Sequence, residues 1–327
     1  MIISKTPLRI SFVGGGSDLR SFYEQAEEGG AVVTTAINKH IYVSVNKKFD
    51  NSIRVSYSKT EEVEYAEDLE HPIVREVLKL LNLYGLEITS VADIPSRGTG
   101  LGSSSAFTVG LLRALHAYQR KFITAEELAE QAARIEIEIL KEPIGKQDQY
   151  GTAIGGLKLL RFHRDGQVSV EPIFCLRETC HALEKNMMLL YTGLTRSAGA
   201  ILSRQQANMA ADQKKHELMK KMVQLAHDLH RELKQNRHET FGDILHANWM
   251  YKKELAEGIT SPEIDLWYET ARRHGATGGK LLGAGGGGFL LIYAPQEKHE
   301  TIKRALPDLR RVDFQFENQG SQIIFIH

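Results

Sequence analysis

The stretch from Pro95 to Ala106 constrains this chain more than any other part of its sequence. Gly98, Gly100 and Gly102 alternate with other residues, three serines follow, and residues 107–118 have the pattern of a helix. Glycine lets the backbone adopt positive φ and approach a ligand closely, and the first turn of a helix offers free N–H groups to an anion. An ordinary strand-to-helix turn is the alternative, but it needs one glycine rather than three. We therefore interpret this stretch as a phosphate-binding loop.

Other nucleotide-binding signatures are absent or fail in their context. The Walker pattern requires Ser or Thr after Gly-Lys, but residues 145–147 and 279–281 continue with Gln and Leu. Residues 283–288 match the glycine pattern of dinucleotide-binding proteins, yet the apolar run after them predicts a strand instead of the required helix. Residues 163–165 imitate the His-Arg-Asp of protein kinases, but Val170 stands where those enzymes need asparagine, and a hairpin turn fits better.

The composition excludes several classes of function. The 327 residues include 41 Lys and Arg and 41 Asp and Glu, so the charge balance does not suggest a nucleic-acid or membrane partner. No apolar run approaches the ~20 residues of a membrane span, and no signal peptide is recognisable. Cys175 and Cys180 form neither a disulfide framework nor a zinc site. We expect a reduced, cytoplasmic enzyme with a small-molecule substrate, and a homodimer is compatible with the sequence.

Periodicity predicts a mixed sheet followed by a largely helical region. Alternating, β-rich sequence predicts strands at 31–37, 40–47, 52–57, 86–91 and 187–191. Thr124 and Glu127 form a capping-box pattern that opens a helix ending near Leu140. The composition changes around 175–187, and we place a domain boundary there, which divides the chain into residues 1–183 and 184–327.

The phosphate loop resembles the signature Pro-x3-Gly-Leu-Gly-Ser-Ser-x-Ala of the GHMP small-molecule kinases, with one extra residue before Gly-Leu-Gly. Two further family motifs follow the family order, at Thr6–Asp18 and at residues 278–288, so the resemblance covers nearly the whole chain. It implies an α+β fold of two domains, with ATP and acceptor between them. The N-terminal domain would contain a mixed sheet with a left-handed βαβ unit, and the C-terminal domain would be ferredoxin-like with extra helices.

The resemblance also implies how ATP and Mg²⁺ are held. The nucleotide-binding residues would be Pro95, Gly98, Gly100, Leu101, Gly102, Ser103, Ser104 and Ser105. Mg²⁺ would bind Ser104 and Glu136, a hydroxyl and a carboxylate of the hard-oxygen kind that this ion prefers. Glu138 competes for the metal role, and a plain surface charge is the alternative for Glu136.

In the same way, the resemblance assigns the catalytic pair. Asp148 would orient or deprotonate the acceptor hydroxyl, and Arg9 would offset charge on the transferring phosphoryl group. The alternatives are a turn residue for Asp148 and a solvated strand-edge charge for Arg9. The acceptor would be lined by Gly14, Gly15, Gly16, Ser17, Asp18, Lys146, Gln147, Gly285 and Gly286.

The acceptor itself is inferred from the form of these motifs. Galactokinases carry Glu-His where this chain has Gly15-Gly16, which makes galactose doubtful and opens the site. The segment Gly-Lys-Gln-Asp-Gln at 145–149 resembles the heptose and fucose kinase branch. The resemblance therefore implies phosphorylation of a heptose 7-phosphate at its anomeric hydroxyl, with Arg196 as a candidate cation for the distal phosphate. A kinase of free L-fucose or mannose, and a catalytically silent sugar sensor, are the alternatives.

Overall fold

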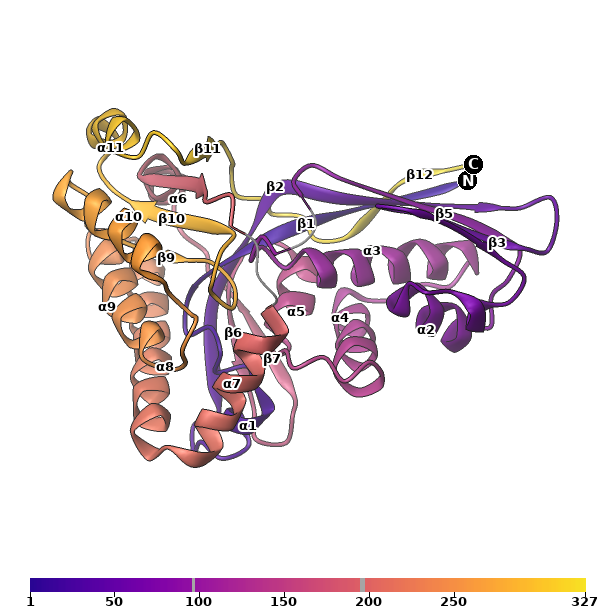
Figure 1. The fold of residues 1–327 in the computed structure, drawn as a ribbon, viewed down its shortest axis with the longest axis horizontal. Coiled ribbons are helices and arrows are strands. Elements are labelled where there is room, and N and C mark those ends of the chain that lie inside the picture. Colours follow the sequence, from indigo (N-terminus) through magenta and orange to yellow (C-terminus); the bar gives the residue numbers. More distant parts are fainter. Residues whose placement is uncertain (96–97, 195–197) are drawn as a thin grey trace.

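Two β-sheets carry the fold in the computed structural model, which describes residues 1–95, 98–194 and 198–327 (Figure 1). The first sheet has eight strands: the order β12-β1-β2-β5-β3-β4 forms its main path, while β6 pairs with β2 and β7 with β6. Its strands are β1 (Ile2–Val13), β2 (Gly30–Lys47), β3 (Ile53–Ser56), β4 (Thr60–Val63), β5 (Leu86–Ala92), β6 (Leu157–Phe162), β7 (Val168–Pro172) and β12 (Gln322–Ile326). Because β3 and β5 run parallel among antiparallel neighbours, the predicted α+β class with a mixed sheet is confirmed.

The long strand β2 organises the first sheet. It pairs with β1 along nearly its whole length, from Ile2↔Val45 to Val13↔Val33. One half of β2 also pairs with β5 and the other half with β6, so the sheet divides into two wings. The segments 31–37 and 40–47, which were expected as separate strands, are therefore one continuous strand.

Helices cover one face of this sheet. The phosphate loop leads into α3, whose buried side chains pack on β1 and β2 beside α2 and α4 (Figure 1). Thr124 and Glu127 form both hydrogen bonds of the predicted capping box at the start of α4. The helices of this region are α1 (Arg20–Tyr23), η1 (Ala66–Asp68), α2 (Pro72–Leu81), α3 (Ser103–Tyr118), α4 (Ala125–Ala133), the π-helix η2 (Arg134–Ile139), α5 (Gln147–Ile154) and α6 (Arg177–Lys185).

The second sheet is antiparallel, with strand order β11-β8-β10-β9. Counted along the chain this is the order 4-1-3-2, which belongs to the predicted ferredoxin-like arrangement. Its strands are β8 (Met187–Tyr191), β9 (Gly278–Leu281), β10 (Phe289–Tyr293) and β11 (Arg310–Val312). The helices are α7 (Ala198–Ala211), α8 (Gln213–Lys234), α9 (Phe241–Lys253), α10 (Pro262–Arg273), η3 (Gln296–Lys298) and α11 (His299–Ala305).

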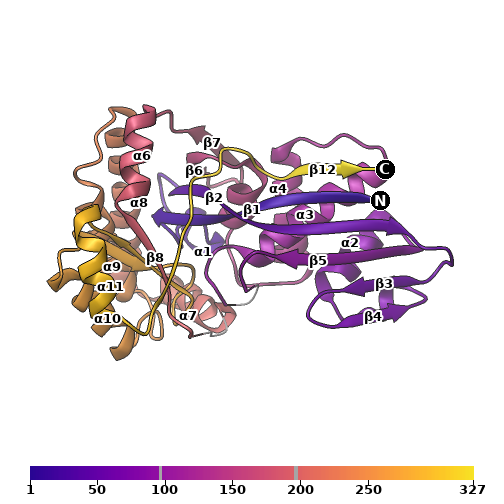
Figure 2. The same ribbon diagram turned by 90° about the horizontal axis from the view of Figure 1, so that it is seen from above.

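The chain returns to the first sheet at its end. After β11 it crosses over, and β12 pairs antiparallel with β1, so that both chain ends lie side by side (Figure 2). The division at 183/184 stays a prediction, and it assigns β12 to the half of the chain whose sheet it does not join. Within the described ranges, no helix is both long enough and apolar enough to span a membrane.

Candidate active site

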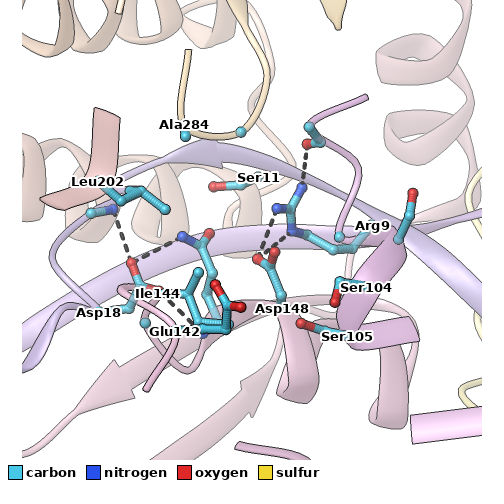
Figure 3. Close-up of a pocket in the computed structure, with 18 of the residues that line it drawn as sticks. Arg9, Ser11, Asp18, Ser104, Ser105, Glu142, Ile144, Asp148, Leu202 and Ala284 are labelled. Atoms are coloured by element: carbon cyan, nitrogen blue, oxygen red, sulfur yellow. Dashed lines mark hydrogen bonds and ion pairs between the residues drawn. The ribbon is translucent and has the colours of Figure 1, made fainter. Parts of the chain in front are cut away.

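A cavity of about 760 Å³ lies where the two halves of the chain meet. The first half contributes β1, the phosphate loop and the start of α5, and the second contributes Lys252 of α9, Lys280 of β9 and the glycine loop after it (Figure 3). Polar side chains converge here from segments far apart in sequence, which is the usual character of a ligand site.

The phosphate loop has the geometry that its glycines predict. Gly98, Gly100 and Gly102 all adopt positive φ, at 68°, 74° and 74°. Gly102 is the N-cap of α3, and no side chain caps this helix. The first turn of α3 therefore faces the cavity without a competing side-chain acceptor, as an anion site requires.

The glycine loop of the second half packs directly on the phosphate loop. A Cβ on Gly100 would lie 2.3 Å from the carbonyl oxygen of Leu282, and one on Gly288 would lie 2.5 Å from that of Thr99. Contacts this close to a neighbouring carbonyl are possible only where the residue is glycine. The two loops thus form one backbone wall of the cavity.

Gly288→Ala should destabilise the protein strongly because the new methyl group has no space. Gly166→Ala is the matched control: it has a similar φ of 85° but meets no atom within 4 Å. Gly166→Ala should lower the free energy of unfolding by about 1–2 kcal/mol, because alanine is strained in the left-handed region. Gly288→Ala carries the same strain, and overpacking should lower the free energy of unfolding by about 1–3 kcal/mol more. Thermal melting of both variants measures this difference, and equal melting temperatures would contradict the packing.

Glu136, on η2, is held by side chains from two other helices, α3 and α5. Its carboxylate, 1% exposed, accepts hydrogen bonds from Ser104 at 2.9 Å, Ser105 at 2.7 Å, Thr108 at 3.1 Å and Gln149 at 2.6 Å. Burial raises the pKa of Glu136, and these donors oppose the shift. The residues predicted for the metal, Ser104 and Glu136, are therefore in direct contact.

Glu138 faces elsewhere. It is exposed and lines a separate cavity of about 510 Å³, whereas Glu136 lines the main one. Both lie on the π-helix η2, and two residues along a helix turn a side chain by roughly 200°. The geometry favours Glu136 over Glu138 as the metal ligand.

The donor set at Glu136 fits Mg²⁺ but provides few protein ligands. Across the described ranges, no three His, Cys, Asp or Glu side chains gather where they could hold a metal ion. Mg²⁺ commonly takes one or two carboxylates and completes its shell with phosphate oxygens and waters. Ser104, which is exposed to the cavity, and Glu136 suit that mode of binding.

Arg9 and Asp148 form an ion pair in the cavity. Nε and Nη2 of Arg9 lie 2.8 and 2.7 Å from Oδ1 of Asp148, and Nη1 donates to the Gly100 carbonyl at 2.8 Å. Arg9 is buried, while Asp148 is partly exposed. A Cβ on Gly102 would be 3.5 Å from Oδ2 of Asp148. The predicted catalytic pair thus lies directly beside the phosphate loop.

Asp18 is fixed at the other end of the cavity. It accepts hydrogen bonds from the Gly16 N–H at 2.9 Å and from the side chain of Gln147, also at 2.9 Å. Burial, and then the charge of Asp148, raise the pKa of Asp18. At Gly16, a Cβ would meet Gln205 at 2.3 Å and Lys252 at 3.2 Å. The opening expected at this glycine is therefore filled by side chains from α7 and α9.

Several predicted acceptor residues do not line this cavity in the described part of the chain. Gly285 packs on Ile259, and Gly283 and Ala284 line the cavity in its place. Lys146 donates to Glu130 and to the Gly166 carbonyl in the separate cavity. The other predicted acceptor residues outside the lining are Gly14, Ser17 and Gly286, and Leu101, which was predicted to bind the nucleotide, also lies outside it. Arg196 lies outside the described residues.

Four polar residues of the cavity outside the phosphate loop were not predicted: Ser11, Glu142, Lys252 and Lys280. Lys280 stands inside the third motif, which was the one sequence signal available. Lys252 lies in the helix α9, and its sequence surroundings show no such signal.

A second cavity, of about 830 Å³, shares Ser103, Ser104 and Glu136 with the first. It is also lined by Ile73, Phe107 and the predicted Pro95, together with polar residues such as Lys59 and Asp93. Apolar side chains such as Ile73 and Phe107 suit the face of a planar ring, and the phosphate loop lies between the two cavities.

Comparisons with known proteins agree with this geometry. Residues 58–156 match the GHMP kinases N terminal domain, and residues 229–310 match the GHMP kinases C terminal domain. D-glycero-alpha-D-manno-heptose 7-phosphate kinase of Campylobacter jejuni is 30% identical over 98% of this chain and 97% of its own length. L-fucokinase/L-fucose-1-P guanylyltransferase of Bacteroides fragilis is 30% identical over 73% of this chain, but only 26% of that relative is covered.

A solved structure shares the whole fold. The crystal structure of a D-glycero-D-manno-heptose 1-phosphate kinase from Bacteroides thetaiotaomicron matches with a TM-score of 0.81 and 25% identity, over 100% of both chains. The two domain matches and the full-length Campylobacter relative together establish the family. This chain belongs to the GHMP kinases, phosphotransferases that use ATP as the phosphate donor, generally with Mg²⁺.

Proposed function

We propose that this kinase transfers the γ-phosphoryl group of ATP to the anomeric hydroxyl of a D-glycero-D-manno-heptose 7-phosphate, giving the 1,7-bisphosphate. The observation that supports phosphoryl transfer here is the Arg9–Asp148 pair beside the phosphate loop. The full-length relative named for heptose 7-phosphate supports the acceptor.

The residues divide the work between positioning and charge. The second cavity, where Ile73 and Phe107 offer apolar contacts, would take the base of the nucleotide, and Gly98–Ser105 would hold its phosphates. Ser104 and Glu136 would hold Mg²⁺, which neutralises phosphate charge. Phosphoryl transfer needs little covalent help from the protein, so these contacts carry much of the catalysis.

Asp148 and Arg9 would act at the reacting atoms. The Oδ2 atom of Asp148, beside Gly102, would accept the proton of the acceptor hydroxyl. Arg9 would stabilise the negative charge that develops near Gly100, because its guanidinium is fixed there by two neighbours.

A substrate panel tests this proposal. We expect kcat/KM for heptose 7-phosphate to exceed that for free heptose, L-fucose or mannose by about 10–10³-fold, since one or two charge-assisted hydrogen bonds contribute that much. Coupled ADP release measures each substrate. A free sugar that outperforms the phosphosugar would support the fucose or mannose alternative, and no ADP release with any sugar would support a silent sensor.

A further inference from the structure

Two buried lysines line the main cavity of about 760 Å³ without an acidic partner in an ion pair. Lys252 and Lys280 are 5% and 4% exposed. Neither forms an ion pair with a carboxylate of the described residues, since no carboxylate oxygen there comes within 4.0 Å of its Nζ atom. The inference drawn from them rests on the proposed function and concerns the chemistry of the acceptor.

Both ammonium groups are held by neutral oxygens alone. Nζ of Lys252 donates to the Gly15 carbonyl at 3.1 Å and to Oε1 of Gln205 at 3.1 Å. Nζ of Lys280 donates to the carbonyls of Ser11 at 2.8 Å and Phe12 at 3.1 Å. An ammonium has three hydrogens to donate, so each lysine retains one beyond these contacts.

The charge of these lysines is poorly compensated. Burial lowers the pKa of Lys252 to about 8, and the carboxylate of Asp18 partly opposes this shift. Burial lowers the pKa of Lys280 well below its usual value, and the charges of Lys252 and Arg9 lower it further. A buried cation without a partner is costly, and an anion in the cavity would remove that cost.

The lysines lie on the side of the cavity away from the reacting groups. Along β1, Ser11 follows Arg9 by two residues, which is about 6.6 Å, and Gly15 lies farther on. Figure 3 shows Ser11 between Arg9 and the end of the cavity with Asp18 and Leu202. Lys280 contacts Ser11 and Lys252 contacts Gly15, so the two cations lie at successive positions along the cavity from Arg9 toward Asp18.

Other polar atoms here also lack partners. The hydroxyl of Ser11 and Nε2 of Gln205 are buried and form no hydrogen bond. Buried polar groups are nearly always hydrogen-bonded, so unpaired ones beside two lysines indicate that a polar ligand completes the site.

We propose that Lys252 and Lys280 bind the phosphate group that the acceptor carries at the end opposite its reacting hydroxyl, and thereby select a phosphorylated sugar. Lys252 and Lys280 would thus bind the distal phosphate, the role that the sequence suggested for Arg196.

Equilibrium binding without nucleotide tests the proposal directly. D-mannose 6-phosphate and D-mannose serve as probes beside heptose 7-phosphate, and calorimetry compares wild type with Lys252→Met and Lys280→Met. Each substitution should weaken binding of the phosphosugars by about 10–100-fold and change mannose binding by less than about threefold. Equal loss for mannose and mannose 6-phosphate would overturn the assignment.

Lys253→Met is the matched control on the same helix. Lys253 pairs with Asp265 outside the cavity, and this variant should bind all probes as wild type does. The two test variants should melt at or above the wild-type temperature, since they remove a buried unpaired charge.

The pH dependence of the wild-type protein gives an independent test if a variant does not fold. A phosphate binds the charged form of a lysine. Where a lysine is neutral in the free protein, it must take up a proton before it can bind the phosphate. Affinity for mannose 6-phosphate should therefore fall as the pH rises above about 8, by up to about tenfold per pH unit as Lys252 loses its charge, and the lowered pKa of Lys280 acts in the same direction. A flat profile would contradict the proposal.

Failure of this inference differs from failure of the proposed function. If wild type prefers heptose 7-phosphate in turnover but both lysine variants keep that preference, the lysines do not bind the phosphate while the function stands. If wild type turns over only a free sugar and binds mannose 6-phosphate no better than mannose, both fail.

Discussion

Asp148→Asn should lower kcat by about 10²–10⁴-fold, the usual loss when a general base is removed. Asparagine retains an oxygen that can accept the hydrogen bonds of Arg9, so the ion pair becomes a hydrogen-bonded pair of the same shape. MgATP binding should stay close to wild type, because Asp148 lies beside the phosphate loop without forming part of it. Single-turnover kinetics and nucleotide titration separate the two effects.

The matched control is Asp165→Asn, which changes an exposed carboxylate in the hairpin turn between β6 and β7. It should leave kcat unchanged. A kcat close to wild type for Asp148→Asn would show that this carboxylate only orients Arg9 and does not take the proton.

Glu136→Gln should raise the Mg²⁺ concentration needed for half-maximal activity by at least about tenfold, equivalent to ~1.4 kcal/mol of metal binding. The amide removes the negative charge and presents N–H donors toward the hydroxyls that now donate to Glu136. Such a mismatch of buried donors should also cost about 1–3 kcal/mol of stability. Mg²⁺ titration of activity and thermal melting measure the two consequences.

Glu138→Gln, two residues away, is the internal control. Its side chain is exposed and lies outside the main cavity, so neither the Mg²⁺ requirement nor the melting temperature should change. The reverse result, with Glu138 controlling the metal, would mean that η2 has a different orientation when nucleotide is bound.

Local chemistry was predictable wherever neighbouring residues alone determine it. The capping box of Thr124, the strand 187–191 and the glycine conformations of the phosphate loop follow from short-range rules of backbone and hydrogen bonding. The family motifs extended this to Arg9 and Asp148, which lie 139 residues apart in sequence and are in contact in the structure.

Long-range packing was not predictable from periodicity. Nothing local in the sequence of β12 shows that it pairs with β1, more than 300 positions earlier. Lys252 looks like an ordinary lysine near the end of a helix, and only the packing of α9 against Gly15 places it in the cavity. In the same way, Gly285 and Gly286 share a motif with Gly283, but the turn directs them toward Ile259.

The wall formed by the two glycine loops limits how this enzyme can diversify. Its contacts, such as Gly100 against Leu282 and Gly288 against Thr99, bring a glycine against main-chain atoms, so any side chain added at these glycines introduces a clash. New acceptor specificities must therefore arise at the opposite wall and on the helices, where side chains such as Gln205 and Lys252 reach across to Gly16. In evolutionary terms, the donor side of the site is fixed, and the variation available for new substrates is concentrated on α7 and α9.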